Sequence, residues 1–477
     1  MTQRIFHAVA RHACQTPDKA ALRSGTRCID YGRLAAFLAQ SAHTLSGSVR
    51  MVGIATDDPL DAALADLALT YSGHVSVHLP PFFSTAQRAH IIEAASIETI
   101  VGAEGLGTEA QVLQCPEECP PLDGPLAPPI DGARRIIFTS GTSGTPKGVL
   151  IGETQMAAAI AGLEKAIAPR AEDRHLSLLP MAQLLEQVAG LYLPLLAGAE
   201  VCFCPESLQS LFGGPMAPVM TAMQASNPTT SIVVPALLSR MVSELKASNR
   251  DAPGSLRMMA VGGAMTSSAL LADARTLGLP VYEGYGLSEC CSVVALTRPD
   301  HARLETVGEV LDGVQLRIDD GEIVVAGPTV MEGYLGQAPV TGEWRTGDMG
   351  RIEDGHLIVE GRKDWLIVTP QGRNINPEWV ESCLCADPRV PAAGLYLAQD
   401  GQLEIIAVVM APVDQDHIKH LLADLPQYAR PARLRFVPAS QEGLLKHGGG
   451  IDRSQLSHLA TMFPSHDLFN DQKECVA

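Results

Sequence analysis

One short segment of this 477-residue chain combines an anion-binding composition with a nearby positive charge. Seven small residues, 139–145, alternate hydroxyl groups with glycines, and Lys147 follows them. Glycine lets the main chain approach a ligand closely, so backbone N–H groups and hydroxyls can surround one anion, and a nucleotide polyphosphate suits such a loop. It is not a Walker loop, because Pro146 and Gly148 replace the Gly and Ser/Thr of that pattern. The candidate phosphate ligands are Thr139, Ser140, Gly141, Thr142, Ser143, Gly144, Thr145 and Lys147.

A second segment, residues 281–289, places an aromatic ring among glycines and ends on a carboxylate. Tyr285 can offer its ring face to a flat base, and Glu289 can bind Mg²⁺. A structural turn with a solvated Glu is the simpler explanation of this segment taken alone. Another glycine segment, residues 261–264, lies just upstream.

A third block contributes a carboxylate and an arginine that could bind a sugar. Asp348 ends the run Trp-Arg-Thr-Gly-Asp, and Arg362 lies in Gly-Arg-Lys-Asp, which ends at Asp364. A carboxylate can accept hydrogen bonds from both ribose hydroxyls, and an arginine adds a charge-assisted bond. Each run alone could be a turn with a surface ion pair, but their order after the first two blocks favours a nucleotide site.

Taken together, the blocks resemble those of the adenylate-forming superfamily, which includes acyl-CoA synthetases, peptide-synthetase adenylation domains and luciferases. The resemblance covers essentially the whole chain and is closest to fatty acyl-CoA or acyl-carrier-protein synthetases. It implies that Mg·ATP and a carboxylic acid form an acyl adenylate and pyrophosphate, and that a thiol then attacks the adenylate. The resemblance implies that Gly262, Gly263 and Ala264 line adenine and the acyl pocket, that Tyr285 beside Gly286 stacks on adenine, and that Asp348 with Arg362 binds the ribose. It also implies that Ser288 contacts the α-phosphate and that Glu289 binds Mg²⁺. Asp364 would be the hinge between the domains, and Arg373 would approach the phosphate in one domain orientation.

The C-terminal region departs from the superfamily pattern at one position. The family places a catalytic Lys directly before Ile-Asp-Arg, and this chain has Gly450 there, with Lys446 four residues upstream. A residue without a side chain cannot stabilise charge that develops in the transition state. Three explanations stay open: Lys446 reaches back across the glycines, adenylation is slow, or the chain is an inactivated variant.

The residues expected to line the acyl pocket are mostly apolar. Amino-acid adenylation domains carry an Asp where this chain has Leu185, and burying an ammonium there would be costly, which disfavours an α-amino acid. The segment 178–187 is similar to that of fatty acyl-CoA synthetases, with Gln183 in place of a His. The sequence predicts an apolar, aliphatic acid, although plain core explains the apolar residues equally well. The candidate pocket residues are Gln183, Leu185, Val234 and Gly262.

The acceptor is left open between CoA and an acyl carrier protein, since both present a phosphopantetheine thiol. The basic run Arg430, Arg433 and Arg435 could meet CoA phosphates or an acidic carrier, but such runs are more often solvated. An amine acceptor would give an amide instead. A degenerate protein that binds ATP or acyl-AMP without turnover is the non-enzymatic alternative.

The elements that must position these residues follow an α/β pattern. Strands are predicted at Met51–Ala55, 135–138, 200–204, 231–234 and Met258–Val261, with helices at 154–165 and 235–246 between them. Short strands and turns follow from about residue 307. The resemblance implies a large N-terminal domain, residues 1–363, of layered α/β subdomains plus a distorted β-barrel, and a small mobile α+β C-terminal lid, residues 364–477.

Composition excludes several classes of protein. The net charge of −18 argues against nucleic-acid binding and against attraction to anionic lipid. The eleven cysteines lack metal-ligand spacing, which favours reduced thiols and a cytoplasmic location. The first residues form no signal peptide, because Arg4, His7, Arg11 and His12 interrupt the apolar pattern, and no apolar run is long enough to span a membrane.

Overall fold

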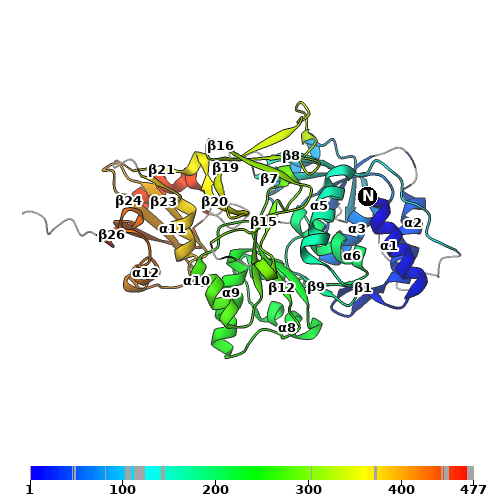
Figure 1. Ribbon diagram of the computed structural model, residues 1–477, viewed down its shortest axis with the longest axis horizontal. Coiled ribbons are helices and arrows are strands. Elements are labelled where there is room, and N and C mark those ends of the chain that lie inside the picture. Colours follow the sequence, from blue (N-terminus) through cyan, green and yellow to red (C-terminus); the bar gives the residue numbers. More distant parts are fainter. Residues whose placement is uncertain are drawn as a thin grey trace, which may run out of the picture.

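The computed structural model describes every residue except 1, 46, 48–49, 81, 103–108, 112–123, 141–145, 302, 304, 370–372, 442–443, 445–450 and 470–477. The described strands form two large sheets, a four-stranded C-terminal sheet and a two-stranded sheet. Figure 1 shows the C-terminal sheet and its helices at one end of the molecule and the first helices at the other. A large N-terminal domain and a small C-terminal domain are therefore present, as predicted.

The larger sheet joins a parallel half to an antiparallel half. Its strand order is β16-β17-β19-β20-β15-β14-β13-β12-β11-β9-β10-β1-β2, and the ladder from β13 to β1 is parallel. The antiparallel half continues the same sheet and contains the short strands predicted from about residue 307. The strands are β1 (Ala20–Ser24), β2 (Arg27–Asp30), β9 (Arg174–Ser177), β10 (Glu200–Phe203), β11 (Thr230–Val233), β12 (Met258–Val261), β13 (Val281–Tyr285), β14 (Ala295–Leu296), β15 (Glu309–Val310), β16 (Gln315–Asp319), β17 (Glu322–Ala326), β19 (Glu343–Glu353) and β20 (His356–Arg362).

The second sheet carries the ends of the phosphate loop. Its order is β18-β8-β7-β4-β3-β5-β6, parallel from β7 to β6 and antiparallel at β7, β8 and β18. The strands are β3 (Met51–Ala55), β4 (Val75–His78), β5 (Thr99–Gly102), β6 (Glu109–Gln111), β7 (Arg134–Ser140), β8 (Pro146–Gly152) and β18 (Gly333–Tyr334).

A layer of helices packs with both large sheets. Side chains of α3, α5 and the π-helix η1 share one buried apolar cluster with strands of both sheets, whereas α8, α9 and α10 cover the other face of the parallel half (Figure 1). Helix α3 is buried all round, as a helix between two apolar surfaces must be. The helices are α1 (Thr2–Gln15), α2 (Tyr31–Thr44), α3 (Pro59–Tyr71), α4 (Thr85–Ala94), α5 (Glu153–Ile167), η1 (Glu186–Tyr192), α6 (Leu193–Ala197), α7 (Ser207–Leu211), α8 (Ala217–Ser226), α9 (Pro235–Ser248) and α10 (Ser268–Thr276).

The C-terminal domain is an α+β unit, as predicted. Its sheet has apolar clusters on both faces. A short 3₁₀ turn, η4 (Lys363–Trp365), connects β20 to this domain and contains Asp364. The elements are β21 (Ile367–Val368), β22 (Asn374–Ile375), β23 (Ala392–Leu397), β24 (Leu403–Val409), β25 (Arg433–Pro438), β26 (His466–Asp467), α11 (Pro377–Leu384), α12 (Gln415–Leu421) and α13 (Leu456–Met462).

Local signals explain why these elements begin and end where they do. The predicted strands at Met51–Ala55 and Met258–Val261 are confirmed with the same bounds. Helix α9 begins with Pro235 in its first turn and ends before Asn249, whose φ of 49° is the left-handed conformation that stops helices. Asp354 has a φ of 50° and precedes Gly355, and these two residues form the turn between β19 and β20.

The described part of the chain contains no disulfide and no membrane-spanning helix. All eight cysteines there are free thiols. Among the described residues, no helix combines the length and the apolar character needed to cross a bilayer.

Candidate active site

The second block lies at the carboxyl ends of parallel strands. β12 ends at Val261, directly before Gly262, and β13 ends at Tyr285. Because the two strands pair in parallel, their carboxyl ends share one edge of the sheet. Open α/β sheets bind ligands at such edges.

The backbone favours glycine at three positions in these segments. A Cβ on Gly262 would lie 2.9 Å from the Gly284 carbonyl oxygen, and one on Gly286 only 1.5 Å from the Ser292 carbonyl oxygen. Gly263 has a φ of +85°, which side chains rarely adopt. Gly263 and Ala264 are exposed, so this backbone is open to a ligand.

Asp348 is the centre of a hydrogen-bond cluster beside this backbone. The Tyr285 hydroxyl donates to Asp348 Oδ2 at 2.6 Å, and Arg362 Nη1 donates to Asp348 Oδ1 at 3.1 Å. Arg362 Nη1 also donates to the Thr346 carbonyl oxygen at 3.0 Å. The structure thus brings together the three residues assigned to adenine and ribose.

The electrostatics of this cluster suit a buried carboxylate that still accepts hydrogen bonds. Burial raises the pKa of Asp348, while the bonds from Tyr285 and Arg362 act in the opposite direction. Burial likewise raises the pKa of Tyr285, so its hydroxyl stays protonated and remains a donor. Each carboxylate oxygen has two lone pairs, which leaves acceptor capacity for a ligand hydroxyl.

The phosphate side of the site contains the second cluster. The Tyr334 hydroxyl donates to Glu289 Oε1 at 2.7 Å, and Lys147 Nζ lies 5.6 Å from the centre of the Tyr334 ring. Thr139 and Lys147 are paired across β7 and β8, at the base of the phosphate loop. The loop residues Gly141, Thr142, Ser143, Gly144 and Thr145 lie outside the described residues, so their role stays a prediction.

The remaining predicted site residues lie in different places. Ser288 begins the 3₁₀ turn Ser288–Cys290 that also carries Glu289. Arg373 is exposed in the C-terminal domain, with its guanidinium 5.6 Å from the ring centre of Tyr428. Lys446 and Gly450 lie outside the described residues.

An apolar cavity of about 50 Å³ lies between helices α5 and η1 and the strands β9, β11 and β12. Leu185, which was predicted to line the acyl pocket, is one of the residues that line this cavity. Gln183, Val234 and Gly262 do not line it. Its walls are formed by Leu163, Ile167, Pro169, Asp173, His175, Leu185, Ala189, Leu193, Pro194, Ala199, Thr230, Ser231, Ile232, Arg257, Met258, Ala260, Val293 and Leu296.

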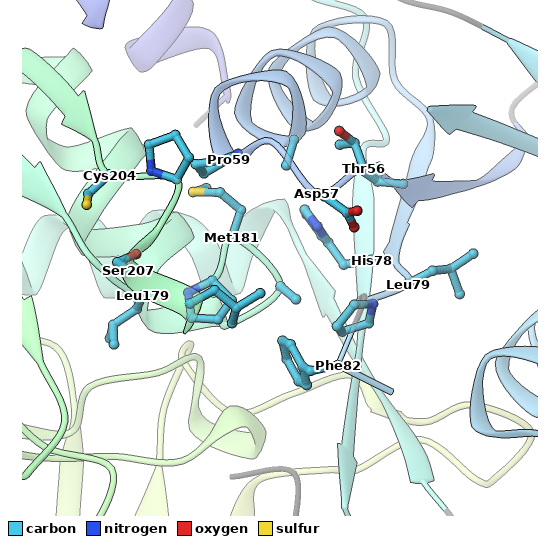
Figure 2. A pocket seen from close by; sticks show the side chains of 17 residues that line it. Thr56, Asp57, Pro59, His78, Leu79, Phe82, Leu179, Met181, Cys204 and Ser207 are labelled. Atoms are coloured by element: carbon cyan, nitrogen blue, oxygen red, sulfur yellow. The ribbon is translucent and has the colours of Figure 1, made fainter. Parts of the chain in front are cut away.

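A second cavity, also of about 50 Å³, lies at the carboxyl ends of β3, β4, β9 and β10. Figure 2 shows Asp57 and His78 next to each other on one side, Cys204 and Ser207 on the other, and Met181 between them. The sequence did not predict this cavity.

Sequence reasoning missed Tyr334 and a buried polar network. Arg135 and Asp66 are only 3% and 0% exposed, and both contact the Tyr192 hydroxyl, at 3.2 and 2.6 Å. Tyr334 stands in a two-residue strand with no periodic pattern, and the network joins three elements distant in sequence. The only available signal was a charged residue, Arg135, inside a predicted apolar strand.

Comparison with known families agrees with this geometry. A family model described as "AMP-binding enzyme" matches residues 9–335, more than half of the chain. The chain belongs to the AMP-binding enzyme family. The resemblance inferred from the motifs is thereby confirmed.

Individual relatives of this AMP-binding enzyme are CoA ligases by name. The chain is 27% identical over 466 residues to the 2-succinylbenzoate–CoA ligase of Bacillus licheniformis, covering 88% of this chain and 94% of that protein. Among solved structures, it is similar to the O-succinylbenzoate CoA synthetase of Bacillus subtilis in complex with AMP, with a TM-score of 0.78, 23% identity, and coverage of 94% and 97%. It also matches an anthranilate CoA ligase in complex with anthranoyl-AMP, with a TM-score of 0.80, 18% identity, and coverage of 96% and 98%. These structural matches confirm the fold.

Proposed function

We propose that this protein is an ATP-dependent acid–thiol ligase that activates an aryl carboxylic acid and transfers it to CoA. The carrying observation is the Tyr285–Asp348–Arg362 cluster at the same sheet edge as the 261–264 glycine segment. Family membership and the names of the relatives support the class of reaction. ATP and Mg²⁺ are its cofactors, and CoA is the acceptor.

In the first step, a carboxylate oxygen of the acid attacks the α-phosphorus of ATP, and the bond from that phosphorus to the bridging oxygen breaks. Pyrophosphate leaves and an acyl adenylate forms. Asp348 and Arg362 would hold the ribose, and Tyr285 would lie against the base. Glu289, fixed by Tyr334, would hold Mg²⁺, which supplies charge neutralisation at the phosphates. Positioning and charge stabilisation account for most of such catalysis.

In the second step, the sulfur of CoA attacks the acyl carbon, the bond to the AMP oxygen breaks, and the thiol proton is released. Thioester and AMP are the products. We place residues 1–363 and 364–477 in two domains that reorient about Asp364 between the steps. The position of Asp364 in the turn between β20 and the C-terminal sheet supports this division.

An aryl acid replaces the aliphatic acid that the sequence predicted. The Bacillus relatives are named for 2-succinylbenzoate and the third relative for anthranilate, and both of these acids carry an aromatic ring. The same relatives are CoA ligases, so CoA is preferred over a carrier protein or an amine as the acceptor.

A panel of aryl and fatty acids with ATP, Mg²⁺ and hydroxylamine tests the substrate assignment, because hydroxylamine converts acyl adenylates to hydroxamates. Aryl acids should give hydroxamate faster than fatty acids. Product analysis with CoA and with amines then identifies the acceptor. Tight ATP binding in calorimetry without hydroxamate from any acid would instead indicate a nucleotide-binding homologue, the alternative that Gly450 raises.

A further inference from the structure

The ring of Trp365 contacts one arginine from each domain. The guanidinium carbon of Arg453 lies 4.9 Å from the centre of this ring, and that of Arg362 lies 6.0 Å from it. Both distances are within the range of a cation–π interaction. Arg362 is the last residue of β20, whereas Arg453 begins the 3₁₀ turn before α13 in the C-terminal domain. One indole ring therefore connects the two domains.

Each arginine is held on its own domain by a carboxylate. Arg362 Nη1 donates to Asp348 Oδ1 at 3.1 Å, within the nucleotide cluster. Arg453 Nη2 donates to Glu381 Oε2 at 2.6 Å, and Glu381 Oε1 accepts a bond from the Leu395 backbone N–H at 2.7 Å. Two guanidiniums near one ring repel each other, and the paired carboxylates reduce this cost.

The C-terminal domain lies against the nucleotide edge in this structure. Asn376 Nδ2 donates to Met265 Sδ at 3.8 Å, and Met265 directly follows the glycine segment. Burial raises the pKa of Glu378 in the same helix turn, and the charge of Asp348 adds to this rise while that of Arg362 opposes it. The first turn of α11 is therefore within electrostatic reach of the proposed ribose ligands.

Trp365 and Arg362 lie on opposite sides of the proposed hinge. They are three residues apart in the sequence, with Asp364 between them. A rotation at Asp364 would carry Trp365 with the C-terminal domain and leave Arg362 on β20. The Trp365–Arg362 contact therefore belongs to the present orientation, whereas the Trp365–Arg453 contact lies within the C-terminal domain and can be kept.

We propose that Trp365 is a positioning residue that holds the C-terminal domain in the orientation for adenylation. This inference rests on the proposed function, because it needs two steps that use different orientations. Trp365 keeps Arg453, the end of the Ile-Asp-Arg run, beside the proposed ribose ligand Arg362. The domain turns for the thioester step only after the Trp365–Arg362 contact breaks.

The test measures the two half-reactions separately in Trp365→Leu. Acid-dependent ATP–pyrophosphate exchange reports adenylation, and AMP release from the synthetic adenylate of the most active aryl acid plus CoA reports thioester formation. Exchange should fall about threefold to thirtyfold, the factor that a cation–π contact contributes to an equilibrium. Thioester formation should be unchanged or faster, because the contact is absent in that orientation.

Two further variants separate positioning from packing. Trp365→Phe keeps a weaker aromatic face, so it should lose less exchange than Trp365→Leu and should carry the test if the leucine variant does not fold. Trp379→Phe, in the apolar cluster of the C-terminal domain, should leave the ratio of the half-reactions unchanged. Thermal unfolding checks that each variant is folded.

The ratio of the two half-reactions decides the outcome. Equal losses in both half-reactions of the folded Trp365 variants would show a merely structural role and overturn the inference. Exchange equal to that of the wild type, or a loss confined to thioester formation, would overturn it as well. A wild-type protein that gives neither exchange nor hydroxamate with any acid would instead contradict the proposed function itself.

Discussion

The Tyr285 hydroxyl donates a 2.6 Å hydrogen bond to Asp348, although 63 residues separate them in the sequence. Tyr285 ends β13 and Asp348 lies on β19, with β14, β15 and β20 between these strands in the sheet. In a flat sheet, strands four steps apart would be about 19 Å from each other. The bond therefore shows that the antiparallel half curls back over the parallel half, which brings the proposed base and ribose ligands together.

Removing the charge of Asp348 should weaken nucleotide binding. Asp348→Asn loses charge-assisted bonds to the ribose, each worth about 1.5–3 kcal/mol, so the Kd for ATP should rise about 10- to 100-fold in calorimetry. Tyr285→Phe keeps the aromatic ring and should raise the Kd for ATP less than tenfold. Asp354→Asn, in the exposed hairpin turn of the same strand pair, is the matched control. An unchanged Kd in Asp348→Asn would contradict the ribose assignment.

Tyr334 should act through Glu289 on the metal. Tyr334→Phe removes the hydroxyl that donates to Glu289, and loss of such an orienting bond commonly lowers metal affinity about 10- to 100-fold. The Mg²⁺ concentration for half-maximal activity should rise accordingly, and excess Mg²⁺ should restore most of the rate. Tyr428→Phe, an exposed tyrosine, serves as control. A Mg²⁺ dependence identical to that of the wild type would show that Tyr334 does not position the ligand.

The buried network around Arg135 should dominate local stability. Arg135→Met removes the guanidinium that lies 3.6 Å from the buried Asp66 carboxylate, which should lower the free energy of unfolding by about 3–5 kcal/mol. Asp66 would keep the hydroxyl donors of Ser76 and Tyr192 and would still lie 3.5 Å from His78. The double variant Asp66→Leu/Arg135→Met should recover much of this loss in unfolding free energy, because two apolar side chains bury no charge that needs a partner of opposite sign. Urea titration measures both. A double variant no more stable than Arg135→Met would refute this explanation.

Glu283, on β13 near the nucleotide site, should make stability depend on pH. Burial raises its pKa to about 7, against the opposing charge of Arg275. Because the folded state binds its proton more tightly than the unfolded state, this stabilisation is complete below about pH 4.5. It is lost as pH rises to about 7, a change of up to about 3 kcal/mol.

Glu283→Gln removes this titration while it keeps the shape of the neutral side chain. The variant should match the wild type in thermal stability at pH 4.5 and exceed it at pH 8. Thermal unfolding at several pH values measures the difference. Equal pH profiles for the two proteins would show that the Glu283 carboxyl is not buried as described.

The missing lysine gives a prediction from the sequence alone. If Lys446 substitutes for the residue expected at Gly450, Lys446→Ala should lower ATP–pyrophosphate exchange about 100- to 1000-fold. Gly450→Lys should then leave exchange unchanged or increase it. An unchanged rate in Lys446→Ala would eliminate the substitution and leave slow adenylation or inactivation as explanations.

The sequence predicted the nucleotide cluster better than it predicted the apolar cavity. Tyr285, Asp348 and Arg362 stand in short blocks whose residue types report their chemistry, and the structure brings them into contact. Parallel strands such as β12 could also be predicted from the sequence, because a short apolar run next to a glycine is a local signal for a buried strand.

The apolar cavity and the partner of Glu289 depend on contacts between segments that are distant in the sequence, and no local sequence pattern predicts such contacts. Leu185 lines the apolar cavity, but His175 and Ala260 reach it from strands that are 85 residues apart in the numbering, and their apolar neighbours look like ordinary core. The sequence also gave no signal for the contact between Tyr334 and Glu289, because Tyr334 is brought to Glu289 by the pairing of β18 with β8. The predicted aliphatic acid is not supported by the names of the relatives, and the sequence could not decide the point because apolar lining does not distinguish an alkyl chain from a ring.

Acid-dependent ATP–pyrophosphate exchange by the purified protein, followed by mass spectrometry of the product with CoA, tests the central claim most directly. We predict exchange that requires Mg²⁺ and an aryl acid, and an aryl-CoA thioester when CoA is added. No exchange with any aryl or fatty acid, from protein that binds ATP normally, would contradict the assignment as an acid–thiol ligase.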